Sequence, residues 1–216
     1  MKKQKISNNV IRRLPKYLHK ADELLAAGVT RVSSSELSEQ LGFTASQIRQ
    51  DFSNFGEFGQ QGYGYEVKEL RRQLEKIMGL DRGYKAILVG VGHIGLALME
   101  NFCFPEWGFN LVHAFDIDKN VVGKEFGGVK VSSMDDLLDY LRKNKVDMAV
   151  LAVPAGAASA VGKVLMNNGV NAIWNFTNVE LAEPASDMII ENIAFSDSLM
   201  SLGYYITEAE KEEDDA

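Results

Sequence analysis

The feature that most constrains the fold is the stretch KAILVGVGHIGLAL at residues 85–98, where an apolar strand pattern runs through three glycines into an apolar helix pattern. Gly90, Gly92 and Gly95 fit the spacing G-x-G-x-x-G. In a dinucleotide-binding βαβ unit the first glycine permits a tight turn, the second lets a pyrophosphate approach the backbone, and the third lets helix and strand pack closely. The phosphates then lie at the helix N-terminus, where free N–H groups favour an anion. The stretch therefore predicts a bound nucleotide, which could serve as a reagent or as a signal.

An acidic residue stands where such a site holds the ribose. Asp116 ends the next strand pattern, LVHAFD, and follows Gly95 by 21 residues. A carboxylate there accepts hydrogen bonds from the ribose hydroxyls and repels a 2′-phosphate, so we predict NAD(H) rather than NADP(H). Asp118 strengthens this preference, and Lys119 weakens it slightly.

The rest of the C-terminal part alternates strand and helix patterns, which predicts an α/β fold with a doubly wound parallel sheet, a Rossmann domain. A last helix is expected at residues 197–208 and a solvated acidic tail at 209–216. The predicted strands are KAILVG, LVHAFD, VKVSS, MAVLAVP and AIWNF, and the predicted helices lie near residues 94–103, 135–144 and 156–168.

The N-terminal part predicts a helix-turn-helix. Apolar residues recur at helical spacing from Val10 to Ala27, and two short helices follow. Ser33 with Glu36, and Thr44 with Gln47, have the spacing of capping boxes. The next stretch, GEFGQQGYGYEV, alternates glycines with aromatic residues and predicts a short hairpin, the wing of a winged helix. A helix from Val67 to Met78 and a glycine-containing linker then place the domain boundary at residues 82–83.

Charge is distributed unevenly along the chain. Residues 1–82 carry 14 Lys/Arg and 10 Asp/Glu, whereas residues 83–216 carry 9 and 20. A basic end on an acidic protein of net charge −7 suits a polyanion met by that end alone. No apolar run approaches the roughly 18 residues of a membrane span, and no targeting segment is indicated, so we expect a cytoplasmic protein. The single cysteine, Cys103, excludes an internal disulfide and a cysteine zinc site, and is expected to be buried.

The sequence offers no set of residues for hydride-transfer catalysis. Such an enzyme needs an acid–base group close to the substrate carbonyl. The three histidines lie in the basic first helix, in the glycine motif and in a strand, at His19, His93 and His113. No partner pattern accompanies them, and little chain remains for a substrate domain. We therefore predict no catalytic residues and no metal site, and interpret the nucleotide as a signal.

With these parts in place, the chain resembles the Rex family of redox-sensing transcriptional repressors along nearly its whole length. The stretches that carry the resemblance are IRRLPKYL, VSSSELSEQLGFTASQIRQDFSNFGEFGQQGYGYEV, GVGHIG, FDID, LAVPA, NFTNVEL and IENIAF. The resemblance implies a homodimer whose winged helices bind an inverted-repeat DNA operator and release it when NADH binds. It also implies a C-terminal helix swapped onto the partner. The domains would be a winged helix at 1–82, a Rossmann domain at 83–196, the swapped helix at 197–208 and the tail at 209–216.

The resemblance also implies the site residues. Those expected to bind the cofactor are Gly90, Val91, Gly92, His93, Ile94, Gly95, Asp116, Ile117, Asp118, Lys119, Val153, Pro154, Asn175, Phe176, Thr177 and Phe195. In DNA binding, Ser46, Gln47, Arg49 and Gln50 would enter the major groove, Arg12 and Arg13 would meet phosphates, and Gln61 and Tyr63 would reach the minor groove.

The chain departs from the family pattern at several positions, among them the stretch NFTNV at residues 175–179, where members read NFAPV. Gln50 and Gln61 stand where members usually carry basic residues, and each lost phosphate contact should weaken DNA binding. Asn101 and Ala194 stand where members carry a tyrosine and an aspartate that link the cofactor to domain closure. A Rex paralogue with a weak or altered nucleotide response is therefore an alternative. A small NAD-dependent oxidoreductase and a CoA-binding ligase-type subunit are others, although neither explains a helix-turn-helix behind a basic arm.

Overall fold

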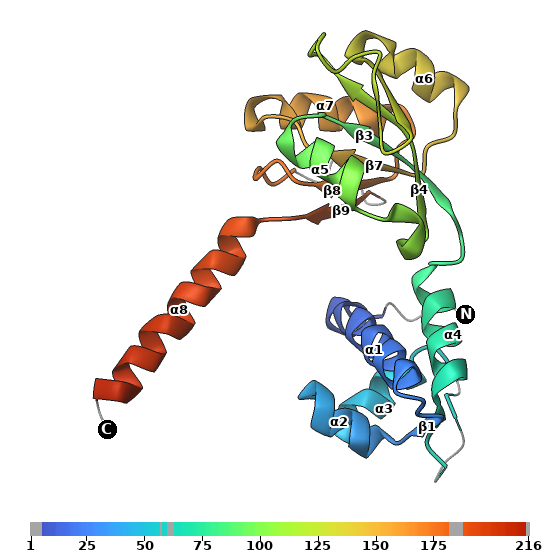
Figure 1. Ribbon diagram of the computed structural model, residues 1–216, viewed down its shortest axis with the longest axis vertical. Coiled ribbons are helices and arrows are strands. Elements are labelled where there is room, and N and C mark those ends of the chain that lie inside the picture. The colour runs from blue at the N-terminus through green and yellow to red at the C-terminus, as the bar shows by residue number, and fades with distance from the viewer. Residues whose placement is uncertain (1–5, 57, 60–62, 182–187, 215–216) are drawn as a thin grey trace. The chain divides into compact units, whose positions relative to one another are not determined.

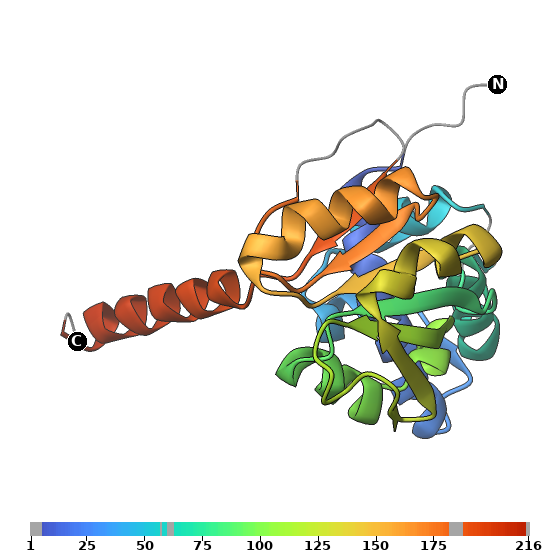
Figure 2. The same ribbon diagram turned by 90° about the horizontal axis from the view of Figure 1, so that it is seen from above.

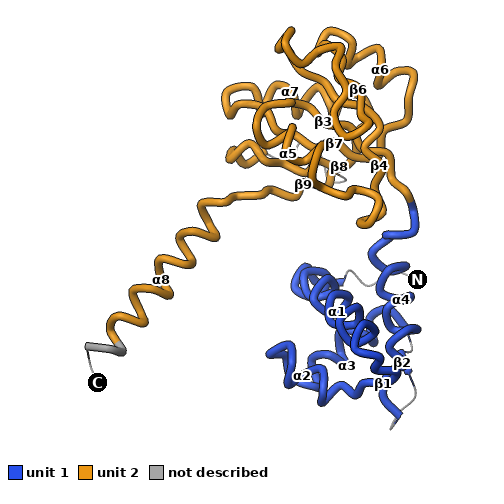
Figure 3. The backbone as a smooth tube through the Cα atoms, in the orientation of Figure 1, with its two compact units in different colours: residues 1–82 blue, residues 83–216 orange. Residues whose placement is uncertain are grey.

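The computed structural model describes residues 6–56, 58–59, 63–181 and 188–214. The chain divides into two compact units, Met1–Arg82 and Gly83–Ala216, called unit 1 and unit 2 below (Figure 3). Each unit has its own hydrophobic core among its described residues.

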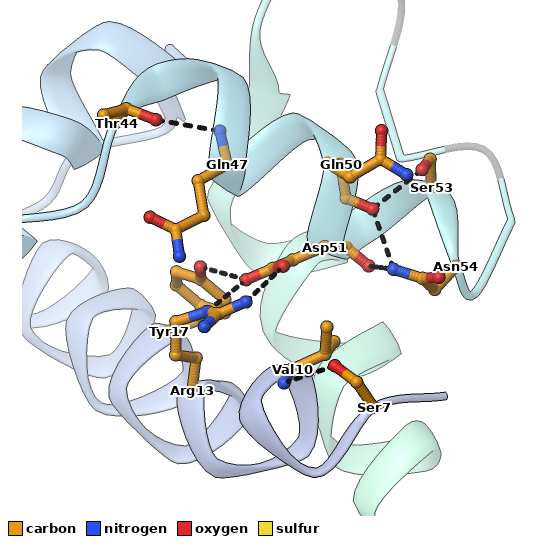
Figure 4. A network of polar contacts seen from close by, with 10 residues as sticks. All are labelled: Ser7, Val10, Arg13, Tyr17, Thr44, Gln47, Gln50, Asp51, Ser53 and Asn54. Carbon is orange, nitrogen blue, oxygen red and sulfur yellow. Dashed lines mark hydrogen bonds and ion pairs between the residues drawn. The ribbon is translucent and has the colours of Figure 1, made fainter. Parts of the chain in front are cut away.

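Unit 1 is a helical domain whose short helices begin at side-chain caps. Ser33 Oγ accepts from Glu36 N at 3.1 Å while Glu36 Oε2 accepts from Ser33 N at 2.6 Å, which confirms the first capping box. Thr44 Oγ1 accepts from Gln47 N at 3.1 Å, but the Gln47 side chain points away from Thr44, so the second box is only half formed (Figure 4). The elements are α1 (Asn8–Ala26), β1 (Arg31–Val32), α2 (Ser34–Leu41), α3 (Ala45–Ser53), β2 (Tyr65–Glu66) and α4 (Val67–Met78) (Figure 1).

Strand β2, at the end of the glycine-rich stretch, has its partner outside that stretch. It pairs antiparallel with β1, with Val32 opposite Tyr65, and no other strand partner is found among the described residues of 56–67. Gly64 makes this pairing possible, because it has a φ of 70° and a Cβ added there would lie 2.7 Å from Val32 O. Gln61, expected at the wing tip, lies outside the described residues.

Unit 2 is built on a seven-stranded sheet in the order β5-β6-β4-β3-β7-β8-β9, parallel except for the β5–β6 pair. The predicted α/β fold is confirmed, with β5 and β9 as additional strands. The elements are β3 (Tyr84–Val89), α5 (His93–Asn101), η1 (Phe104–Trp107), β4 (Phe109–Asp116), β5 (Glu125–Phe126), β6 (Val129–Ser133), η2 (Met134–Asp136), α6 (Leu137–Lys143), β7 (Met148–Leu151), α7 (Ala155–Asn167), β8 (Ala172–Asn175), β9 (Ile189–Asn192) and α8 (Phe195–Asp214).

The central strand β3 supplies both cores of unit 2. Ile87 and Val89 pack in the core beneath α6 and α7, while Ala86 and Leu88 pack in the core that includes Met99 of α5. Figure 2 shows α7 and α5 covering opposite faces of the sheet. From β3 the chain adds β4 on one side and later β7 on the other, so the strand order reverses there. A reversal of this kind leaves a ligand-binding crevice at the carboxyl ends of the strands.

Two expectations need correction. The last helix, α8, runs from Phe195 to Asp214, longer than the predicted 197–208, so most of the expected acidic tail is helical. Glu208 accepts from Lys211 at 2.7 Å one turn along, and glutamates are good helix formers, which offsets the unfavourable acidic charge at a helix C-terminus. Cys103 is exposed rather than buried, because it lies in the turn between α5 and η1.

Candidate nucleotide and DNA sites

The glycine loop has the backbone of a phosphate site. Gly90 has a φ of 98°, and a Cβ there would lie 2.5 Å from Ala152 O at the end of β7. A Cβ on Gly95 would lie 2.0 Å from Gly90 O, so these two glycines are needed for packing. Gly92 is different, because nothing lies within 4 Å of a Cβ built there. It is also the N-cap of α5 and has no side chain to cap the helix, which leaves space for an anion at the first turn.

Asp116 lies beside this loop. Its Oδ2 accepts from Val91 N at 2.5 Å and its Oδ1 accepts from Asp118 N at 2.7 Å. The carboxylate is thus fixed at the end of β4, next to the glycine loop, as a group that binds the ribose of the same nucleotide must be. After it come Ile117, which is 83% exposed, and the exposed Asp118 and Lys119. An anchored carboxylate followed by an open apolar side chain suits the ribose and base of a dinucleotide.

The ends of β7 and β8 form the other side of the crevice. Pro154 is exposed at the start of α7, and Val153 is half-buried. Asn175 is 2% exposed, and its Nδ2 donates to Val179 O and to Asn192 Oδ1, both at 2.7 Å. Thr177 in turn donates to Asn175 Oδ1 from its N at 3.1 Å and from its Oγ1 at 2.7 Å.

This network makes Asn175 and Thr177 parts of a rigid turn, with buried polar groups that already have partners. Asn192, which ties the turn to β9, was not predicted, and no local sequence pattern marks a contact across 17 residues. The phenyl ring of Phe176 lies 6.4 Å from that of Phe195, which is 56% exposed at the start of α8. The cofactor residues predicted after β7 and β8 therefore lie at the carboxyl ends of the strands.

The structure also places Asn101 and Ala194, the two positions at which the sequence is expected to depart from the family pattern. Asn101 Nδ2 donates to Ala97 O of its own helix at 3.2 Å, so the amide is directed back onto α5. Ala194, half-buried before α8, has no polar side chain.

The second helix of the helix-turn-helix presents a polar surface. Ser46, Arg49 and Gln50 are exposed on α3, whereas Gln47 is half-buried and Ile48 and Phe52 are buried. Arg49 is held by neutral partners, with Nη1 donating to Ser34 Oγ at 2.9 Å and Nη2 to Ser46 Oγ at 3.0 Å. Its charge is therefore not offset by these partners, as a base-reading arginine requires. Tyr63 of the wing is 71% exposed.

Arg13, predicted to meet a DNA phosphate, is paired with a carboxylate inside unit 1. Its Nε and Nη2 donate to the two carboxylate oxygens of Asp51, at 2.6 and 2.7 Å, and its side chain is 17% exposed (Figure 4). A guanidinium held this way has its charge neutralised within the protein. Arg12, the neighbouring residue, is exposed. The pattern of Ile48, Asp51, Phe52 and Phe55 at spacings of three and four could have placed Asp51 on the inner face of α3.

Groups for other chemistry are few in the part of the chain that the structure describes. There, no cluster of three or more His, Cys, Asp or Glu side chains could hold a metal ion. His93 is exposed at the start of α5, and His113 Nε2 lies 2.9 Å from Ser132 Oγ. None of the described helices is both long and apolar enough to cross a membrane.

An apolar cleft of about 640 Å³ lies at the amino ends of the strands, opposite the glycine loop. Aromatic side chains dominate its wall, among them Phe102, Phe104, Trp107 and Trp174. It is therefore separate from the glycine loop, which lies at the carboxyl ends.

Comparisons with known proteins agree with this arrangement. The family model "Putative DNA-binding protein N-terminus" matches residues 5–53, and "CoA binding domain" matches residues 81–179. The redox-sensing transcriptional repressor Rex of Caldicellulosiruptor bescii is 49% identical over 96% of this chain and 95% of its own length. Rex of Clostridium acetobutylicum is 46% identical over 99% of both chains.

Solved structures of the Rex-family repressor RSP match along the whole chain. RSP in complex with β-NAD⁺ and operator DNA has a TM-score of 0.90 at 44% identity, covering 98% of this chain and 97% of that one. RSP in complex with β-NADH has a TM-score of 0.89 at 40% identity, covering 99% of this chain and all of that one. With a helix-turn-helix, a glycine loop at the switch point of the sheet, and relatives of this likeness over its full length, the chain belongs to the Rex family of redox-sensing transcriptional repressors.

Proposed function

We propose that this protein is a transcriptional repressor that senses the NADH/NAD state, binding an inverted-repeat operator as a homodimer and leaving it when NADH binds. The observation that carries the proposal is the open Gly92 at the start of α5, beside an anchored Asp116, in a chain that also carries a capped helix-turn-helix. The nucleotide acts as a signal, in line with relatives named as repressors and solved with either nucleotide.

The nucleotide would lie across the carboxyl edge of the sheet. Its pyrophosphate meets the loop Gly90–Gly95 and the first turn of α5, and its ribose meets Asp116, which favours NAD(H) over NADP(H). Ile117, Asp118 and Lys119 border the adenosine end. Val153, Pro154, Asn175, Phe176, Thr177 and Phe195 border the nicotinamide end.

The operator would be read by α3. Arg49 pairs with a guanine edge in the major groove, and Ser46, Gln47 and Gln50 lie on the same helix. Arg12 contacts a phosphate, and Tyr63 with Gln61 approaches the minor groove. We place the protein in the cytoplasm, where the DNA of bacteria such as those of its relatives lies.

The homodimer is supported by α8. Seven large apolar side chains of this helix are more than half exposed, which is unusual for a helix facing water alone. The apolar cleft at the amino ends of the strands offers a surface of matching character. We propose that α8 of one copy covers apolar surface of the other. The seven residues are Phe195, Leu199, Met200, Leu202, Tyr204, Tyr205 and Ile206.

A gel-shift titration tests the function. The operator is first obtained by selecting duplexes from a random pool with the purified full-length protein, and NADH and NAD⁺ are then added separately. Release at low NADH with retention in NAD⁺ is the expected result. Selection of no preferred duplex, or equal release by both nucleotides, would contradict it.

A repressor with a weakened nucleotide response is the second candidate, favoured by the side chains at two positions. The Asn101 amide bonds within its own helix, and Ala194 has no polar group. Restoring both groups in Asn101→Tyr with Ala194→Asp should make release sharper in NADH concentration. If the unaltered protein already leaves its operator completely at low NADH, this second candidate is wrong.

A further inference from the structure

The inner face of the operator-reading helix carries a buried charge. Asp51 of α3 is 2% exposed, and both of its carboxylate oxygens are occupied. Arg13 of α1 donates two hydrogen bonds in a fork, and Tyr17 Oη donates a third to Oδ2 at 2.6 Å. Figure 4 shows the three side chains meeting between the two helices. Every donor of this cluster comes from α1.

Arg13 and Tyr17, the two partners of Asp51, are themselves held in place by neighbouring side chains. Arg13 and Tyr17 are four residues apart on α1, so they share one face of that helix. The Tyr17 ring makes edge contacts with Phe43, at 5.8 Å, and with Phe52, at 5.0 Å. The Arg13 guanidinium also lies 5.8 Å from the Phe43 ring centre. A planar fork on a carboxylate fixes both distance and angle, whereas apolar contacts alone allow a helix to rotate.

This rotation matters because of where Asp51 lies relative to Arg49. At about 100° per residue, two residues place Arg49 about 200° around the helix from Asp51, almost on the opposite face. Fixing Asp51 against α1 therefore fixes the direction in which Arg49 points outward. A bidentate contact to a guanine edge tolerates little misdirection.

The same contacts remove Arg13 from use by DNA. The hydrogen bond to Asp51 raises the pKa of Arg13, which keeps the guanidinium charged, and the carboxylate neutralises it in place. Burial, followed by the bond to Asp51, raises the pKa of Tyr17 above its usual range, so its hydroxyl remains a donor. A neutralised cation displaces few counterions from DNA.

We propose that Asp51 is a positioning residue for operator reading, and that Arg13 holds Asp51 instead of contacting a DNA phosphate. The proposal rests on the proposed function as a DNA-binding repressor and deepens it. It assigns the orientation of Arg49 to Asp51 and Arg13, whose side chains meet between α3 and α1.

The first test separates positioning from fold stability by a double-mutant cycle in the full-length protein. The affinities for the selected operator and for a random duplex are measured for Asp51→Asn, Arg49→Ala and the double variant. If Asp51 acts through Arg49, Asp51→Asn lowers the operator-to-random ratio by about 5- to 150-fold, the range of one bidentate contact. The same change then has little further effect on this ratio in the Arg49→Ala background. Additive losses would overturn the proposal, because an effect on stability alone is independent of Arg49.

The second test concerns the charge of Arg13. The slope of log K against log salt falls by about 0.9 for each lost phosphate contact. Arg13→Met should leave this slope unchanged, whereas the matched variant Arg12→Met, at the exposed neighbouring residue, should reduce it. A reduction of about 0.9 in Arg13→Met would overturn the proposal.

Folding is monitored by thermal unfolding of each variant. If Asp51→Asn does not fold, Tyr17→Phe replaces it in the cycle, since it removes one of the three hydrogen bonds and leaves the ion pair. Failure of the unaltered protein to select any operator is a separate outcome that refutes the proposed function.

Discussion

Replacing Gly92 by alanine separates the two roles that a glycine loop can have, which are close backbone packing and the binding of a phosphate. Nothing lies within 4 Å of a Cβ at Gly92, and its φ of −75° is available to any residue, so the fold should tolerate the methyl group. Loss of glycine at an N-cap costs the helix less than about 1 kcal/mol. Gly95→Ala is the matched control, because its Cβ would lie 2.0 Å from Gly90 O and the loop must move. Overpacking of this kind typically costs about 1–3 kcal/mol, or roughly 2–12 °C in melting temperature for a chain of this size.

Although Gly92→Ala should leave the fold intact, it should weaken the binding of NADH. A methyl group on Gly92 fills the space where a pyrophosphate would approach the first-turn N–H groups of α5. Loss of one hydrogen bond to a charged group is worth about 1.5–3 kcal/mol, so NADH should bind about 10- to 150-fold more weakly to Gly92→Ala. The assay is calorimetric titration with NADH beside thermal unfolding without nucleotide. NADH affinity within twofold of the unaltered protein would refute the assignment of this space to the pyrophosphate.

Four further changes test other parts of the molecule. Asp116→Ala should weaken NADH binding and narrow its advantage over NADPH in calorimetry, and equal affinities for the two in the unaltered protein would contradict the assignment. Arg49→Ala should abolish the preference for operator over random duplex in gel shifts, whereas general weakening with preference retained would indicate a phosphate contact. Leu199→Asp combined with Ile206→Asp should convert the proposed dimer to a monomer in light scattering, and a dimer mass unchanged by the two substitutions would exclude α8 from the interface. Burial, with a smaller contribution from a nearby lysine, lowers the pKa of His113. The unfolded chain therefore binds more protons than the folded one, and the free energy of unfolding should fall as the pH drops through about 6.5. His113→Asn should flatten the pH dependence of the urea midpoint between pH 8 and 5.5.

Local signals explain what the sequence predicts well. The capping box at Ser33 and the helix from Val67 to Met78, which ends at Gly79 with a φ of 72°, depend on residues a few positions apart. The glycine loop is equally local, and its spacing requires a strand before it and a helix after it. Such features can be recognised without knowledge of the rest of the fold.

Long-range pairings explain what the sequence does not predict. Asp51 lies 38 residues from Arg13, and no local pattern predicts that the two side chains pair. The partner of β2 is likewise β1, more than 30 residues earlier, although the glycines around it suggested a self-contained hairpin. The length of α8 was underestimated because its acidic end has the composition of a solvated tail. In each case a contact or a helix boundary depends on the context of the chain and not on the segment alone.

The release of DNA by the nucleotide requires residues that couple the two binding sites. A ligand shifts a conformational equilibrium only by its differential affinity for the two states, typically about 1–3 kcal/mol between coupled sites. The Asn101 amide bonds within its own helix and Ala194 has no polar side chain, so neither is expected to supply much of that energy. The turn held by Asn175 remains, since it joins the nicotinamide edge to β9 through Asn192, only three residues before α8 begins. We therefore expect a differential contact of the nicotinamide with this turn to act on α8 through Asn192, so that Asn192→Ala should reduce the release of DNA by NADH in gel shifts.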